Sequence, residues 1–277
     1  PRIPLGEIAS MPDKHATRRM QEIYSAPIRP ELIKERIQQI RGAGVTVAAS
    51  LSPQRTAELH KAVIDAGVDI FVIRGTTVSA EHVAVADEAL NLKKFIYELD
   101  VPVIVGGVAT TTGALHLMRA GAAGVLVGFG GGATHTTRSV LGIEVPMASA
   151  VAEVAAARRE YLDESGGRYV HVIADGSIGK SGDIAKAIAC GADAVMMGSA
   201  LAKCAESPGL GWHWGSEAYH PELPRGARMN VGTVGTLAEV LTGPSHTADG
   251  SMNLFGALRR AMATCGYSDL KSFQRVD

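Results

Sequence analysis

Residues 101–130, VPVIVGGVATTTGALHLMRAGAAGVLVGFG, contain two apolar runs joined by a helical stretch that ends at glycine. Continuous apolar runs of this length are typical of parallel strands buried on both faces of a sheet. The same order of helix, glycine and apolar run recurs along the chain without hairpin signals, which indicates a parallel α/β sheet. The sequence therefore predicts six units in which a helix precedes a strand.

The predicted helices and strands alternate along most of the chain. The helices are expected at 31–44, 52–67, 91–99, 111–121, 146–164 and 181–191, and the strands at 45–50, 68–75, 101–108, 123–130, 169–176 and 192–200. At four junctions a glycine follows the helix, where a left-handed residue would cap it. We expect a single domain over 1–277, made of an N-terminal extension (1–27), the repeats (28–205) and a C-terminal segment of loops and helices (206–277). The extension is expected to contain an amphipathic helix at 16–25. The C-terminal segment is expected to contain a loop at 211–237 and a helix at 254–266.

The residues that follow the strands favour a closed barrel over an open doubly wound sheet. Both folds fit the alternation of helices and strands. Glycine or small polar residues follow at least five strands, in IRGTT, VGGVAT, VGFGGGATHTTR, IADGS and MMGSA. A doubly wound sheet concentrates its ligand loops at one switch point, whereas a barrel uses a ring of loops. We therefore expect a TIM (β/α)8-type barrel.

Composition excludes several classes of protein. With 27 Lys and Arg against 28 Asp and Glu, the net charge is -1, so we expect no nucleic-acid partner held by bulk charge. Cys190, Cys204 and Cys265 are widely spaced and form no CxxC pair, which fits a reducing cytosol better than a disulfide framework or a zinc site. No apolar run approaches the roughly 20 residues of a membrane span. We expect a soluble cytoplasmic protein.

The ends of the last two predicted strands indicate a phosphate site. DGS (175–177) and GS (198–199) follow the last two predicted strands, where barrels commonly bind phosphate. Backbone N–H groups of Gly176, Ser177, Gly198 and Ser199 could hold the phosphate, and Asp175 could accept hydrogen bonds from a ribose diol. The alternative is a purely structural role, in which these residues form turns and Ser199 is a helix N-cap.

The glycine-rich stretch 127–147 is the second candidate site. Its bare backbone could bind a cation through carbonyl groups or an anion through N–H groups. His135, followed by Thr137 and Arg138, could be a base, a ligand contact or only a polar loop residue. Arg74 directly follows a buried strand and could bind a ligand or form a salt bridge. The other histidines considered, His60, His116 and His171, are expected to be structural, and Cys190 to be a core residue.

These segments resemble a known family. ADGSIGKSGDIAKAIACGADAVMMGSALA (174–202) resembles the phosphate-binding segment of IMP dehydrogenases and GMP reductases, and VGGVATTTGALHLMRAGAAGVLVGFGGGATHTTR resembles their catalytic loop with the strand before it. The resemblance runs from about residue 44 to the end. RRMQEIYSAPI and SMNLFGALRRAMATCGY are similar to the divergent, actinobacterial IMP-dehydrogenase-related branch.

The resemblance implies a cytoplasmic enzyme of purine nucleotide metabolism and GMP biosynthesis that oxidises IMP to XMP with NAD. It implies a homo-oligomer, a tetramer in the family, and a (β/α)8 barrel. The phosphate and ribose residues would be Asp175, Gly176, Ser177, Gly198 and Ser199. Carried over by position, His135, Thr137 and Arg138 would be catalytic, Arg74 and Gly107 would contact the cofactor, and the carbonyl groups of Gly130, Gly132 and His135 would bind potassium.

The departures from the family pattern concern the chemistry itself. The family loop reads G-P-G-S-x-C-T-T-R, and here His135 stands at the cysteine position and Ala133 at the phosphate-binding serine. An imidazole cannot form the family's thioimidate. Arg74 and Gly75 replace an Asp at a strand exit, and no counterpart of the family's flap, with its Arg-Tyr pair, is found in 211–230. The purine-reading E/Q is missing from PRGARMN.

The count of strands also departs from the family. We count six βα units where the family barrel has eight, and no CBS domains, so we expect either a fragment of a longer product or six units that close differently. Two functions remain open. One is an active NAD-dependent oxidoreductase in which His135 acts as a base rather than a nucleophile. The other is a catalytically inactive purine-nucleotide binder that regulates or partners the authentic dehydrogenase. An unrelated phosphosugar barrel is a third possibility.

Overall fold

The structure is a computed structural model that describes residues 2–75 and 90–275. It divides into two compact units, each described here by itself. The repeat unit comprises Pro27–Phe129 and Ser149–Ile173, and the site unit comprises Pro1–Ala26, Gly130–Ala148 and Ala174–Asp277. The single domain expected from the sequence stays a prediction. Thr76 and Thr77 of the predicted strand exit IRGTT lie outside the described residues.

The repeat unit is built on parallel strands in the predicted order. Its strands are β1 (Ala48–Leu51), β2 (Ile70–Arg74), β3 (Val103–Val108) and β4 (Gly124–Val127), followed by the first residues of β5 (His171–Asp175). The pairs β1–β2, β2–β3 and β3–β4 are all parallel. The strand order continues along the chain as β1-β2-β3-β4-β5-β6, with β6 at Ala194–Met196.

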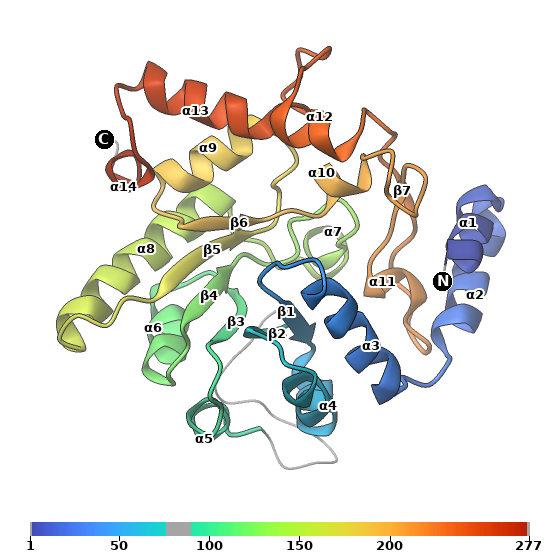
Figure 1. Ribbon diagram of the computed structural model, residues 1–277, viewed down its shortest axis with the longest axis horizontal. Helices are drawn as coiled ribbons and strands as arrows, with labels where there is room; N and C mark the ends of the chain where they lie inside the picture. The colour runs from blue at the N-terminus through green and yellow to red at the C-terminus, as the bar shows by residue number, and fades with distance from the viewer. Residues whose placement is uncertain (1, 76–89, 276–277) are drawn as a thin grey trace. The chain divides into compact units, whose positions relative to one another are not determined.

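Each strand of the repeat unit is preceded in the chain by a helix (Figure 1). These helices are α3 (Pro30–Arg41), α4 (Pro53–Asp65), α5 (Leu92–Tyr97), α6 (Thr111–Arg119) and α8 (Met147–Glu164). The core includes Phe71, Val105 and Leu126, which are fully buried. Strands this apolar cannot face water, because each buried aliphatic side chain stabilises the fold by about 1.5–3 kcal/mol. The sequence prediction of buried parallel strands is confirmed for β2, β3 and β4. It is wrong for β1 and β6, whose residues are exposed or half-buried because these strands lie at the two ends of the strand order.

The helix-ending glycines take the conformation that was expected. Gly67 follows α4 at φ 86° and Gly121 follows α6 at φ 107°. A residue with a Cβ is strained in that region, so glycine lets the chain leave the helix and enter the next strand within a few residues.

The site unit contains the remaining elements. They are α1 (Arg2–Ser10), α2 (Asp13–Tyr24), α7 (Thr137–Leu141), α9 (Ser181–Ala189), β6, α10 (Ser199–Ala202), β7 (Trp212–His213), α11 (Ser216–Tyr219), β8 (Met229–Asn230), α12 (Leu237–Thr242), α13 (Leu254–Thr264) and α14 (Leu270–Phe273). β7 and β8 pair antiparallel. The predicted helices at 181–191 and 254–266 are confirmed. The predicted loop at 211–237 holds short elements, and the helix α1 was not predicted.

An N-terminal arm, α1 and α2, packs against the short helix α11 and lies beside β7 in Figure 1. Their contact is an apolar cluster in which Ile8, Met20 and Ala218 are buried, with Trp214 and Tyr219 packed against them. The rings of Tyr24 and Tyr219 stack at a centroid distance of 3.7 Å. The arm therefore holds the segment that carries α11. No helix among the described residues is long and apolar enough to span a membrane.

Candidate functional site

The glycine loop between β4 and α7 is closely packed. A Cβ on Gly130, whose φ is 52°, would lie 2.2 Å from the hydroxyl oxygen of Thr137. A Cβ on Gly132 would lie 2.9 Å from the ring of His135. Because no side chain fits at these two positions, the backbone can pass close to Thr137 and His135. The loop is therefore built on buried Thr137 rather than being an open turn.

The two predicted loops meet. Ser177 donates to the carbonyl of Gly131 from its backbone N–H at 3.1 Å and from its hydroxyl at 2.8 Å. A Cβ on Gly176 would come within 3.2 Å of the Gly131 backbone. The loop after β5 and the loop after β4 are thus joined. Both donors of Ser177 are used in this contact.

His135 is paired with a buried carboxylate that the sequence did not reveal. Its Nδ1–H donates to Oε1 of Glu217 at 3.0 Å, and the side chains of His135 and Glu217 are 24% and 4% exposed. The hydrogen bond from His135 holds the pKa of Glu217 below its ordinary value, against burial, which raises it. The second carboxylate oxygen, Oε2, has no hydrogen-bond partner in the part of the chain that is described.

This pairing fixes the tautomer of the neutral imidazole. A carboxylate that accepts from Nδ1 holds a proton on that nitrogen, so in the neutral ring the lone pair is on Nε2. The same arrangement of carboxylate and histidine orients the base in hydrolytic triads. His135 is therefore suited to take a proton through Nε2.

A second histidine lies at the predicted phosphate loop. Nδ1 of His213 is 3.4 Å from the hydroxyl oxygen of Ser199. A Cβ on Gly198 would meet the His213 ring at 3.4 Å. Burial lowers the pKa of His213 below its ordinary value, and the nearby His135 lowers it further. His135 and His213 thus belong to one electrostatic environment.

The other predicted site residues are Arg138, Asp175, Arg74 and Gly107. Arg138 is exposed and contacts Glu144 at 3.3 Å. Asp175 is half-buried at the end of β5. In the repeat unit, Arg74 is half-buried at the end of β2, while Gly107 is buried and its N–H donates to the carbonyl of Gly75 at 3.0 Å.

The residues predicted to bind potassium are Gly130, Gly132 and His135. The Gly132 carbonyl accepts a hydrogen bond from the N–H of His135 at 3.1 Å. A carbonyl oxygen has two lone pairs, so Gly132 retains one for a cation. The carbonyl of the neighbouring Gly131, which is not a predicted ligand, accepts two hydrogen bonds from Ser177. Within the described ranges, no group of three His, Cys, Asp or Glu side chains could hold a metal ion.

The cysteines do not enter this site. Cys204 is buried, its pKa is raised by burial, and Cys265 is exposed. The expectation that Cys190 is a core residue is wrong, because this residue is half-buried at the end of α9. The ring of His60 bonds to the carbonyl of Thr56 at 3.0 Å, as expected of a structural histidine.

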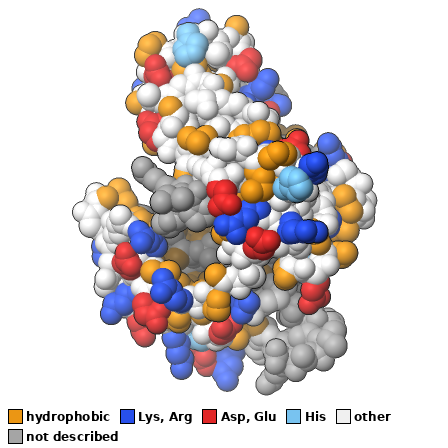
Figure 2. Space-filling view, turned by 90° about the vertical axis from the view of Figure 1, so that its right-hand side faces the viewer, with side chains coloured by type: hydrophobic (Ala, Val, Ile, Leu, Met, Phe, Trp, Pro, Cys, Tyr) orange, Lys and Arg blue, Asp and Glu red, His pale blue; other side chains and the backbone are white. Residues whose placement is uncertain are grey.

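Glu217 and His213 are the site residues that sequence reasoning missed. The signal was WHWGSEAYH (212–220), an aromatic and titratable cluster in a stretch expected to be a loop. Its partners lie far away in sequence, since Glu217 and His135 are 82 positions apart. On the face shown in Figure 2, basic and acidic side chains are intermingled, so that face carries no basic stripe for nucleic acid.

The chain is similar in sequence to known proteins. The model of the IMP dehydrogenase / GMP reductase domain matches residues 18–276. A protein named as an uncharacterized oxidoreductase of Mycolicibacterium smegmatis is 57% identical over 264 residues, which is 94% of this chain and 70% of that protein. An inosine-5'-monophosphate dehydrogenase of Methanocaldococcus jannaschii is 36% identical over 262 residues, covering 82% of this chain and 49% of the enzyme.

A solved structure matches the whole fold. It is the crystal structure of an IMP dehydrogenase/GMP reductase-like protein from Corynebacterium glutamicum, 51% identical, with a TM-score of 0.91 over 100% of this chain and 73% of that one. The prediction of a barrel-type α/β fold with six βα units is confirmed. The chain belongs to the IMP dehydrogenase / GMP reductase family of oxidoreductases.

Proposed function

We propose that the protein oxidises a purine nucleoside monophosphate, IMP to XMP with NAD, without a covalent cysteine intermediate. The observation that carries the proposal is the hydrogen bond from His135 to buried Glu217, because it turns the residue at the cysteine position into a general base. Membership of an oxidoreductase family supplies the reaction class. The family also suggests a homo-oligomer, which we propose as a tetramer.

The chain's own residues would act as follows. Glu217 holds the Nδ1 proton of His135, and Nε2 removes a proton from a water that attacks C2 of the purine. The oxygen of that water bonds to C2, the hydride leaves C2, and the product tautomerises to the 2-oxo base. The proton on His135 passes to solvent, so IMP, water and NAD+ give XMP, NADH and a proton. Bound NAD supplies the acceptor of the hydride.

The residues present fit the proposed ligands to different degrees. A half-buried guanidinium such as that of Arg74 suits a pyrophosphate, so Arg74 is our candidate for NAD. Gly198 and Ser199 are candidates for the phosphate, and Asp175 for the ribose. Potassium stays a prediction, and no step of the mechanism depends on it.

The alternative is a catalytically inactive nucleotide binder that regulates or partners the authentic dehydrogenase. The cysteine position is occupied by His135, and both donors of Ser177 are used within the protein. The two functions differ in turnover but share binding of the nucleotide.

The test is NADH formation from IMP and NAD with potassium present. We expect His135→Ala to lower kcat by about 10²–10⁴-fold, the usual contribution of a general base. Glu217→Gln should lower kcat while the Kd for IMP stays nearly unchanged, and His60→Gln, whose ring bonds to the carbonyl of Thr56 within α4, should match the wild type. If the wild type does not turn over but IMP still raises its Tm, the inactive binder is correct. If IMP, GMP and XMP all fail to shift the Tm, the nucleotide site itself is refuted.

Treatment with iodoacetamide separates this mechanism from the family's covalent one. Because no cysteine occupies the site, turnover should survive alkylation of exposed Cys265 and half-buried Cys190. Turnover that is lost on alkylation, and protected by IMP, would place a cysteine in the reaction and overturn the proposal.

A further inference from the structure

We propose that His213 binds the phosphate of the nucleotide and, in its protonated form, adds a positive charge to the N–H and O–H donors of the Gly198–Ser199 loop. The inference rests on the proposed function, because it takes Gly198 and Ser199 as the phosphate loop. It adds a residue that the sequence did not single out. Ala133, at the position of a phosphate-binding serine, has no hydroxyl to donate.

The position of His213 supports a phosphate contact. Its Nδ1 lies 3.4 Å from Oγ of Ser199, and its ring carbon Cε1 would lie 3.4 Å from a Cβ on Gly198. The imidazole therefore lies against both residues of the loop. An anion that binds the Gly198–Ser199 backbone meets this ring.

The backbone on both sides of His213 is held firmly. The guanidinium of Arg228 covers the ring of Trp212 at 3.9 Å. The indole N–H of Trp214 donates to the hydroxyl of Tyr24 at 3.1 Å, and Trp214 packs on the apolar cluster of the N-terminal arm. With both neighbours fixed, the imidazole needs little further ordering when a ligand binds.

Protonation of His213 changes the donors at the loop. In the neutral form with its proton on Nε2, Nδ1 accepts a hydrogen bond from the Ser199 hydroxyl, which is then not available to a ligand. In the protonated form, Nδ1–H donates to Oγ, so the Ser199 O–H is released, while the Nε2–H donor is present in both forms. One proton thus provides a positive charge and releases one donor for a phosphate.

In the absence of a bound anion, the surroundings of His213 favour its neutral form. β7 packs against α10 and β8, and neither Ser199–Ala202 nor Met229–Asn230 contains a charged side chain. The nearby charged or titratable groups are His135, its partner Glu217, and Arg228 over Trp212. Burial and His135 lower the pKa of His213, so the free protein is expected to hold it neutral at pH 7.

Binding of a phosphate dianion reverses this balance. An adjacent anion raises the pKa of a histidine, so the complex should take up a proton from solvent. The affinity for IMP should therefore rise as the pH falls from about 8.5 toward about 6.5. Below that range the phosphate itself gains a proton, since its second pKa is about 6, and the gain is lost.

Isothermal titration calorimetry of the full chain with IMP tests the proposal. Titrations at pH 7.5 in buffers of different ionisation enthalpy measure the protons taken up per IMP. We expect net uptake in the wild type. His213→Ala should bind IMP about 10- to 100-fold more weakly, the range for a hydrogen bond to a charged group. Inosine, which has no phosphate, should bind both proteins equally.

A conservative variant distinguishes charge from shape. His213→Gln keeps a neutral donor but cannot titrate, so it should abolish proton uptake while losing less affinity than His213→Ala. His116→Gln, an exposed histidine on α6, is the control and should behave as the wild type. The Tm of each variant shows whether it is folded.

The outcomes separate this inference from the proposed function. If Ser199→Ala weakens IMP but His213→Ala and His213→Gln bind as the wild type with unchanged uptake, the role of His213 is refuted and the phosphate loop stands. If both His213 variants weaken IMP and inosine equally, His213 acts on the nucleoside or the fold, and the proposal is also refuted. If wild-type protein binds neither IMP nor inorganic phosphate, both proposals fall.

Discussion

Replacing Arg228 by Met should detach the N-terminal arm without unfolding the rest of the chain. The Arg228 side chain is 4% exposed, and its guanidinium donates to the carbonyls of Ile8, Ala9 and Met11, which lie at the end of α1 and just after it.

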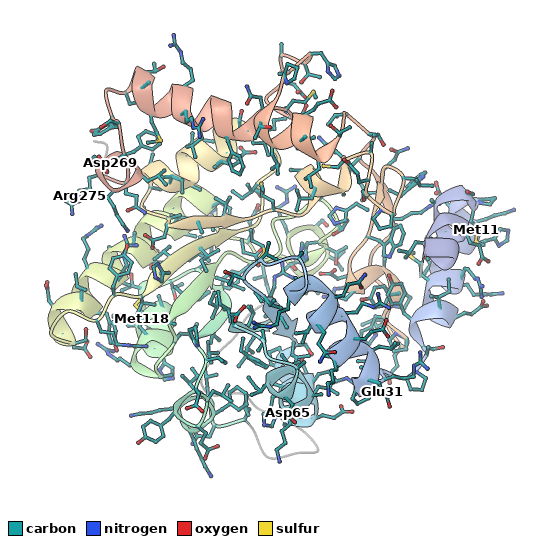
Figure 3. All side chains as sticks on the ribbon, in the orientation of Figure 1. Met11, Glu31, Asp65, Met118, Asp269 and Arg275 are labelled. Atoms are coloured by element: carbon teal, nitrogen blue, oxygen red, sulfur yellow. The ribbon has the colours of Figure 1, made fainter. Side chains whose placement is uncertain are left out.

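 Met11, labelled in Figure 3, lies at the turn between α1 and α2. Arg228→Met keeps most of the aliphatic stem but leaves these carbonyls without their buried donor.

The loss of stability expected in each variant depends on whether the contact that it removes is buried. A hydrogen bond from a charged donor contributes about 1.5–3 kcal/mol, and removing one partner of a buried charged contact costs about 3–5 kcal/mol. The ion pair with Asp13, at 2.9 Å, adds little, because the Asp13 side chain is 84% exposed and such pairs contribute at most about 1 kcal/mol. We therefore expect Arg228→Met to destabilise the arm by about 3–5 kcal/mol and Asp13→Asn by less than about 1 kcal/mol.

Amide hydrogen exchange measures this opening directly. A loss of about 3–5 kcal/mol makes opening of the arm about a hundredfold to several thousandfold more favourable, since each 1.4 kcal/mol is a factor of ten. Exchange should accelerate in α2 of Arg228→Met and stay unchanged in β3 of the repeat unit. Equal effects of Arg228→Met and Asp13→Asn, or unchanged protection in α2, would refute the reasoning.

Two further predictions concern stability. Gly130→Ala should lower the free energy of unfolding in urea by about 2–4 kcal/mol, because φ is 52° and the added Cβ would meet Thr137. Gly142→Ala, at φ 68° with open space around it, should lower it by about 1 kcal/mol. Equal losses would show that packing in the loop is unimportant. The hydroxyl of Ser251, followed by its backbone N–H, lowers the pKa of Asp249 from 3.8 to about 2. The carboxylate therefore stabilises the fold above about pH 4. The free energy of unfolding of the wild type should exceed that of Asp249→Asn at neutral pH, and this difference should vanish as the pH falls toward 2. A difference in the free energy of unfolding that does not depend on pH would contradict this.

The fold could be predicted because its signals are local. At four junctions a glycine follows the helix, and the predicted strands are apolar runs, so neighbouring residues suffice to place these elements. The bounds shift where a distant contact intervenes: the strand predicted at 45–50 begins at Ala48, and the N–H of Val47 donates to the carboxylate of Asp69 at 2.8 Å. α1 was missed for the same reason, because the carbonyls at its end bind Arg228, 219 positions from Ala9.

The site could be predicted only where it lies at strand exits. The meeting of Gly131 and Ser177 follows from parallel topology, which brings the ends of consecutive strands to one edge. Nothing local pairs His135 with Glu217, because that contact depends on where the segment after β7 is held. A buried carboxylate in a stretch rich in aromatic residues gives no periodic signal.

The segment from Trp212 to Glu217 joins the arm to both parts of the proposed site. Trp212 and Trp214 are held by Arg228 and Tyr24, while His213 reaches Ser199 and Glu217 reaches His135. Detaching the arm should therefore weaken phosphate binding and lower kcat together, whereas Glu217→Gln should affect kcat alone. If Arg228→Met opens the arm by hydrogen exchange yet binds and turns over IMP as the wild type does, the segment keeps its position without the arm, and this coupling is refuted.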